Sequence, residues 1–166
     1  PWMLALLPWT TVAAAAEPRA AARELLQERL PNGMTVSVLA DPSYPVVATQ
    51  LWYHVGSANE TPGTRGFAHL FEHLMFNGTA THGPRELWDL HERLGGKVNA
   101  YTTVDETVYV SEAPPGGLDG LLRLEADRMV DISLTQANLE KEQRIVTEEL
   151  RLRTENNPLN RLLVVA

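Results

Sequence analysis

The chain has 166 residues, of which 44% are hydrophobic and 21% are charged. This length and composition are typical of one globular domain with a sizeable core. The net charge of −7 at neutral pH argues against nucleic acid or an anionic membrane as a partner. Because the chain contains no cysteine, it has no disulfide and no thiolate ligand, so any metal must be bound by His, Asp or Glu.

The N-terminal segment differs from the rest of the chain. Residues 2–16 carry no charged side chain, and the small residues Ala14 and Ala16 precede Glu17. An apolar run that ends in small residues is typical of a signal peptide. We therefore expect residues 1–16 to be a signal-peptide remnant and the protein to be periplasmic or secreted; an Ala-rich tail is the alternative. A stable membrane span is not expected, because the run is shorter than about 20 residues and contains Pro8.

Local patterns predict the elements in chain order. The charged residues 17–30 predict a short helix or an arm, which ends at a Pro-Asn-Gly turn. Alternation and β-branched residues predict a strand at 34–40 and a long central strand at 46–55. A loop rich in Gly, Pro and Thr follows at 56–66, and residues 97–113 predict two strands or one long bent strand. Helices are expected at 67–76, 84–94, 117–130 and 135–156.

This order of strands and helices predicts an α+β fold, in which an antiparallel-rich sheet has helices packed on one face. No internal repeat divides the sequence into more than one such domain.

Three ionisable residues lie close together in the predicted helix 67–76: His69, Glu72 and His73. The two histidines are four residues apart, so they lie on one helix face about 6 Å apart along the axis. Two imidazoles at this spacing can bind a single ion. The opposite side of the helix is an apolar stripe formed by Phe67, Leu70, Phe71 and Leu74. The pattern therefore predicts a helix with one buried side and one side that lines a site.

The pentapeptide HLFEH, residues 69–73, is the inverted form of the zinc-peptidase motif His-Glu-x-x-His. A catalytic zinc has three protein ligands and one position for water. Glu72 would then act as the general base towards that water and transfer the proton to the leaving amine. Two exposed histidines on an amphipathic helix are the alternative. Sites built from His and Glu also accept manganese or cobalt.

The third ligand is expected on the predicted helix 135–156. One stripe of this helix is apolar except for Glu142 and Glu149, whereas Glu148 belongs to a charged stripe. A carboxylate on a core-facing stripe is unfavourable unless it is paired or bound to a cation, which favours Glu149 over Glu148 as the ligand. Glu142 is expected to orient a ligand or to hold a proton. Alternatively, it interacts only with the helix dipole in the first turn.

Several segments together resemble the pitrilysin-type zinc peptidases (family M16, the inverzincins), which include insulin-degrading enzyme and the mitochondrial processing peptidase. The resemblance covers about residues 25–161 and supports Glu149 as the third ligand and Glu142 as an additional acidic residue. The matching segments are LPNGMTV (30–36), WYHVGSANE (52–60), GTRGFAHLFEHLMFNGT (63–79), LGGKVNAYTTVDETVYVSEAP (94–114), and EEL with ENNPLNR (148–161).

The resemblance implies a zinc endopeptidase, with one Zn²⁺ per catalytic half, that hydrolyses small or unfolded polypeptides in an enclosed chamber. The substrate is expected to add as a strand to a sheet edge, at Asn99, Ala100 and Tyr101. Asn99 would bind the substrate backbone near the scissile bond; the alternative is that Asn99 is a turn residue after Gly95-Gly96.

Members of the pitrilysin-type family, which this chain resembles, have two homologous halves, in one chain or in two subunits. Residues 17–166 are therefore expected to be the N-terminal portion of the catalytic half, truncated by several strands. A second homologous half is the expected partner, and the chain alone is expected to be weak or inactive.

The alternative function is a non-catalytic, polypeptide-binding partner half of a two-subunit peptidase. The presence of His69, Glu72, His73 and Glu149 favours the enzyme, because inactive halves of such peptidases lose ligands or base. A zinc enzyme with another reaction is a third reading. The remaining histidines are expected to lie outside the site. His54 is expected to be packed or hydrogen-bonded in the central strand, and His82 and His91 are expected to lie on the surface.

Overall fold

The computed structural model describes residues 24–155. The segment predicted to be a signal-peptide remnant, 1–16, lies outside these residues, so that export stays a prediction. The chain divides into two compact units, one up to Tyr44 and one from Pro45.

The first unit is a β-hairpin. Strand β1 (Leu25–Arg29) pairs antiparallel with β2 (Thr35–Leu39), from Leu25 opposite Leu39 to Arg29 opposite Thr35. The strand predicted at 34–40 is confirmed, whereas the helix or arm predicted at 17–30 is wrong for residues 25–29. The tight turn before β2 brings this segment alongside a second strand. The main-chain hydrogen bonds between the two strands outweigh the weak helix preference of a short charged segment.

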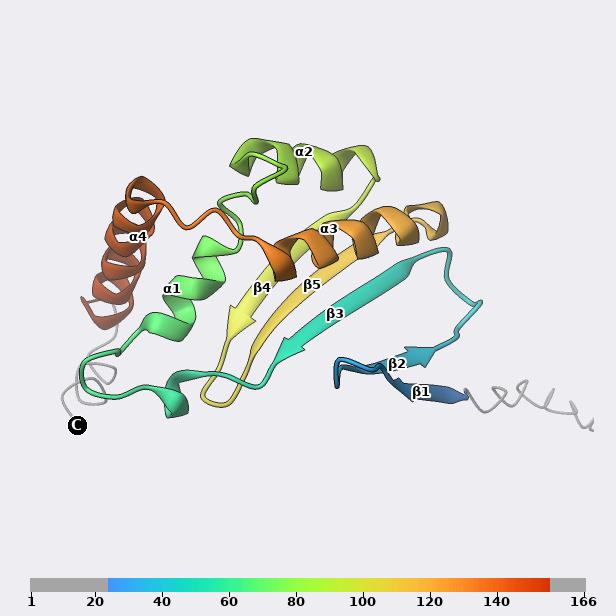
Figure 1. Cartoon of the computed structure of the whole chain (residues 1–166), viewed down its shortest axis with the longest axis horizontal. Coiled ribbons are helices and arrows are strands. Elements are labelled where there is room, and N and C mark those ends of the chain that lie inside the picture. The colour runs from blue at the N-terminus through green and yellow to red at the C-terminus, as the bar shows by residue number, and fades with distance from the viewer. Residues whose placement is uncertain (1–23, 156–166) are drawn as a thin grey trace, which may run out of the picture. The chain divides into compact units, whose positions relative to one another are not determined.

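The second unit contains a three-stranded antiparallel sheet in the order β3–β5–β4 (Figure 1). Its strands are β3 (Val47–Tyr53), β4 (Lys97–Thr102) and β5 (Thr107–Ala113). Residues 97–113 thus form two strands joined by a short turn. The prediction that β3 is central is wrong within the described sheet. β5 takes the central place because it pairs with both other strands.

Four α-helices follow the predicted boundaries to within a few residues: α1 (Phe67–Leu74), α2 (Pro84–Arg93), α3 (Leu118–Val130) and α4 (Gln136–Glu155). Two single turns, η1 (Ser57–Asn59) and η2 (Pro115–Gly117), complete the unit. Within residues 24–155, no helix combines the length and the apolar composition that crossing a bilayer requires.

Helices α1 and α3 cover the same face of the sheet. Glu72 of α1 hydrogen-bonds Thr102, and Glu125 of α3 hydrogen-bonds Ser111. Thr102 pairs with Thr107, which lies four residues before Ser111 on β5, so all three strand residues point to one side. The predicted α+β fold, with an antiparallel sheet and helices on one face, is confirmed.

A side-chain cluster around Asp127 ties the loop after α1 to the end of α3. The Asp127 carboxylate accepts hydrogen bonds from Thr79 Oγ1 at 2.5 Å, Thr81 Oγ1 at 2.8 Å and His82 Nδ1 at 3.0 Å. These contacts, chiefly the bond from Thr79, hold the pKa of Asp127 below its usual value. The segments that lead away from α1 and towards α4 are therefore joined before α4 begins.

We expect Asp127→Asn to lower the free energy of unfolding by about 1–3 kcal/mol at pH 7, because it weakens hydrogen bonds to a charged acceptor. The folded-state pKa lies below the unfolded value of about 3.9, so this stabilisation is present above that value and is lost as the pH falls through the folded pKa. Urea unfolding at pH 7 and pH 3 should show a difference between wild type and variant that shrinks in acid. Asp131→Asn removes the same charge nearby and is the control; an equal effect there would contradict the role of Asp127.

Candidate metal centre

Helix α1 begins at an anionic cap supplied by the preceding loop. The Glu60 carboxylate accepts hydrogen bonds from the backbone N–H groups of Gly66 at 2.7 Å and Ala68 at 2.9 Å. A negative charge at a helix N-terminus satisfies free N–H groups and interacts favourably with the helix dipole. Glu60 thereby fixes the end of α1 from which the two histidines follow.

The loop that carries Glu60 is itself held against the turn between β4 and β5. Ser57 N and Ala58 N donate to the carbonyl oxygens of Thr103 and Val104, at 3.1 and 2.8 Å. Gly56 permits this approach, because a Cβ there would lie 2.5 Å from both carbonyl oxygens. The start of α1 is thus positioned relative to the end of β4.

The side of α1 predicted to be buried is only partly buried. Leu70 and Leu74 are buried against the sheet, whereas Phe67 and Phe71 are half exposed. These two phenylalanines line an apolar cavity of about 440 Å³, together with residues of β3 and β5 that include Tyr53 and Tyr109. The buried side is confirmed for the leucines. The phenylalanines keep partial exposure, because that cavity separates them from the sheet.

On the other side of α1, His69 and His73 meet Glu149 of α4. One ligand atom from each residue lies within 4.8 Å of the others. The two Nε2 atoms are 3.3 Å apart; Glu149 Oε2 is 3.6 Å from His69 Nε2, and its Oε1 is 3.9 Å from His73 Nε2. Two nitrogens bound to one tetrahedral ion at 2.0–2.1 Å stand about 3.3 Å apart. The three groups therefore fit a single divalent ion.

The protonation of the two imidazoles suits metal binding. His73 Nδ1 lies 3.1 Å from Glu142 Oε2. Because a carboxylate only accepts, the proton resides on Nδ1 and leaves the Nε2 lone pair directed at His69 and Glu149. Burial, followed by the neighbouring His73, lowers the pKa of His69 more than Glu72 and Glu149 raise it. Neutral imidazole is the form that binds a metal.

The second acidic residue of α4, Glu142, is 4% exposed and lies beside a candidate ligand. Burial raises its pKa, but hydrogen bonds from Lys141, Asn77 and His73 together lower it below the usual value. Glu142 is therefore a buried anion in contact with His73; its role in orienting a ligand stays a prediction. The alternative, a carboxylate that interacts only with the helix dipole in the first turn, is wrong, because the first turn of α4 contains no acidic residue.

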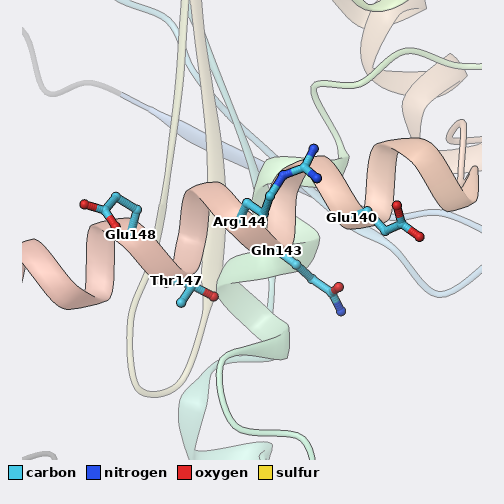
Figure 2. A pocket seen from close by; sticks show the side chains of 5 residues that line it. All are labelled: Glu140, Gln143, Arg144, Thr147 and Glu148. Atoms are coloured by element: carbon cyan, nitrogen blue, oxygen red, sulfur yellow. The ribbon is translucent and has the colours of Figure 1, made fainter.

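Glu148 lies on a different face of α4. Figure 2 shows it with Glu140, Gln143, Arg144 and Thr147, which together line a hollow on the surface of the helix. At about 100° per residue, this face is turned roughly opposite to Glu142 and Glu149. The structure thus brings Glu149, and not Glu148, to the histidines.

Glu72 is 9% exposed and is held by the last residue of β4. The hydroxyl of Thr102 donates to Glu72 Oε2, and Thr107 Oγ1, 3.4 Å from Thr102 Oγ1, donates to the Val55 carbonyl at 3.0 Å. Sequence reasoning missed Thr102. The period of two in β4 places it on the same face as Ala100, but the contact with Glu72 depends on tertiary packing.

Comparison with known proteins identifies the family to which this arrangement belongs. The profile of the insulinase family (peptidase family M16) matches residues 35–163. The chain belongs to peptidase family M16.

The chain is also similar to individual members of the M16 family. A zinc protease of Helicobacter pylori is 37% identical over 134 residues, which cover 80% of this chain and 30% of that protein. The mitochondrial-processing peptidase subunit beta of Blastocladiella emersonii is 30% identical over 121 residues, covering 73% and 26%. A crystal structure of a protease from Helicobacter pylori matches with a TM-score of 0.77 at 33% identity, covering 82% of this chain and 33% of that one. This M16 chain therefore spans about 30% of the length of such relatives.

The segment predicted to bind substrate in the M16 chain is part of strand β4. Among the described residues, β4 pairs with β5 on one side only. Asn99 and Tyr101 alternate with Ala100 and Thr102, so their side chains lie on the sheet face away from α1. The alternative that Asn99 is a turn residue is wrong, because it lies within β4. Its contact with substrate stays a prediction.

The other histidines of the M16 chain lie apart from the cluster, but two of the three expectations are wrong. His91 is buried at 3% exposure, with Nδ1 2.8 Å from the Leu87 carbonyl oxygen, because α2 packs this side against neighbouring elements. His54 follows the end of β3 and is exposed. His82 is partly exposed, as expected of a residue near the surface, and contacts Asp127.

We expect the purified chain to contain about one zinc ion, and His73→Ala or Glu149→Ala to lose it, since each removes one of three ligands. Elemental analysis after dialysis against trace zinc measures this directly. The matched control is Glu148→Ala, which removes the same charge from the adjacent position on the outer face. Zinc retained in Glu149→Ala would overturn the assignment of Glu149 as a ligand, and zinc lost in Glu148→Ala as well would show that the loss is not specific to Glu149.

Proposed function

We propose that this chain provides the catalytic metal site of a zinc endopeptidase that hydrolyses peptide bonds in small or unfolded polypeptides. The observation that carries the proposal is the convergence of His69, His73 and Glu149, with the buried Glu72 on the same helix as the histidines. Membership of the M16 family and similarity to a protein named a zinc protease support a peptidase.

The donor set suits one Zn²⁺ ion held by two neutral imidazoles and one carboxylate. Such ligands also accept manganese or cobalt. We propose zinc because a relative is named a zinc protease. When bound, the ion would polarise the scissile carbonyl and make a water molecule more acidic.

Glu72 would perform the proton transfers. Thr102 occupies Glu72 Oε2, which leaves Oε1 to accept a proton from the attacking water and to deliver it to the leaving amine. The hydroxyl of Thr102 fixes the orientation of the carboxylate.

The substrate would add as an antiparallel or parallel strand beside β4. One edge of β4 pairs with no other strand among residues 24–155 and offers backbone groups to a polypeptide, and the last residue of β4, Thr102, contacts Glu72. A peptide paired along Asn99, Ala100 and Tyr101 would therefore extend towards the general base. Strand addition of this kind relies on hydrogen bonds to the main chain of the substrate, so it suits extended or unfolded polypeptides.

The complete enzyme would need a second homologous half as its partner. The chain spans about 30% of the zinc protease of Helicobacter pylori, and another relative is named as a subunit of the mitochondrial-processing peptidase. A polypeptide chamber would be closed by that half, in the same chain or in a separate subunit.

Glu72→Gln should lower the rate of peptide hydrolysis by at least about 100-fold, because it removes the base, while the zinc content stays unchanged. The assay uses an internally quenched unfolded peptide and the full-length protein that carries this chain, with Glu148→Gln as the control. Undiminished hydrolysis by Glu72→Gln would exclude Glu72 as the base, and hydrolysis by zinc-free protein would exclude the metal mechanism.

A further inference from the structure

The amide of Asn77 lies at the centre of a buried network between α1 and α4. Asn77 is 3% exposed. Its Nδ2 donates to Glu142 Oε1 at 2.9 Å and to the His73 carbonyl oxygen at 3.1 Å, and its Oδ1 accepts from Lys141 Nζ at 2.9 Å. Both amide N–H groups and the amide oxygen are therefore used.

The orientation of this amide is fixed by the chemistry of its neighbours. Its nitrogen faces a carboxylate and a carbonyl, which only accept, and its oxygen faces an ammonium, which only donates. A flipped amide would place oxygen against two acceptors and nitrogen against a donor, so one orientation is strongly favoured.

The network determines the rotation of the Glu142 carboxylate. One carboxylate oxygen accepts from His73 Nδ1 at 3.1 Å, and the other lies 2.9 Å from both Asn77 Nδ2 and Lys141 Nζ. The Lys141 side chain is 53% exposed, whereas Asn77 is buried. The buried amide is thus the more rigid of the two donors that hold this oxygen.

Asn77 is well placed to act on His73. It lies three residues beyond the end of α1, and its Nδ2 bonds one oxygen of the Glu142 carboxylate while His73 Nδ1 contacts the other. Its backbone is also fixed, because Asn77 N donates to the Leu74 carbonyl at 3.0 Å as α1 ends.

We propose that Asn77 is a positioning residue for the metal site: it orients Glu142, which in turn orients the His73 ring towards the ion. This inference rests on the proposed metal site, although it concerns a residue that contacts neither the metal nor the substrate.

The first test measures the dissociation constant of Zn²⁺ by competition with a chromophoric chelator. Asn77→Leu should weaken zinc binding by about tenfold, the lower end of the loss seen when partners of metal ligands are removed. Asn77→Ser should weaken zinc binding to a similar extent, and it still tests the inference if Asn77→Leu does not fold. Its hydroxyl can still bond the His73 carbonyl, but it is too short to reach Glu142.

Asn138→Leu is the matched control. Asn138 also donates its side-chain amide to a backbone carbonyl, that of Ser133 at 3.0 Å, and it lies at the start of α4. The control should lose stability without losing zinc affinity. Unfolding in the presence of a chelator reports the stability of each variant separately from metal binding.

A double-mutant cycle with Glu142→Gln distinguishes positioning from general stabilisation. If Asn77 acts through Glu142, Asn77→Leu should change zinc affinity less than about twofold in the Glu142→Gln background. If Asn77→Leu lowers zinc affinity tenfold in both backgrounds, or does not lower it in the wild-type background, the inference is overturned. If the wild-type chain folds and binds no zinc, the proposed metal site itself fails, which is a separate outcome.

Discussion

The hydrogen bond between His73 of α1 and Glu142 of α4 connects the two helices that carry all three candidate ligands. Neither helix can form the cluster alone, because α1 supplies two of the three candidate ligand atoms and α4 supplies the third. The bond joins them at a point where both side chains are at least partly buried, and it also selects the imidazole tautomer. This one contact therefore contributes both to the packing of the two helices and to the tautomer of a candidate ligand.

The rest of the second unit holds this contact in place from three directions. Glu60 caps the start of α1, and the Asp127 cluster fixes the loop after it. A third support is Arg128 of α3, which is 1% exposed, pairs with Glu125 and lies over the rings of Phe76 and Tyr109. Since Phe76 lies two residues after the end of α1, this cation–π contact links the site helix to the core of the sheet.

Local sequence was sufficient for most of the fold. Period and capping signals located the four helices, and helix geometry alone favoured Glu149 over Glu148. The errors arose where distant segments decide. Residues 25–29 became a strand because β2 provides a partner, and His91 is buried because α2 packs against other elements. Thr102 and Asn77 were missed for the same reason, since their partners lie 30 and 65 residues away in the sequence.

The three carboxylates near the histidines differ in how completely they are satisfied. Glu142 is held by an amide, an ammonium and an imidazole, and Glu72 by a hydroxyl, and both are buried. The Glu149 side chain is 37% exposed, with Arg153 3.5 Å away and the imidazoles at 3.6 and 3.9 Å.

This difference in exposure suggests an order for metal binding. An ion loses less hydration when it first meets a carboxylate that is still in contact with water. Glu149 would therefore contact an incoming cation before the two imidazoles do. The buried Glu142 already holds the proton of His73 on the far nitrogen, so the Nε2 lone pair needs no rearrangement when the ion arrives. The least buried candidate ligand would thus admit the ion, and the buried Glu142 would keep the site ready for it.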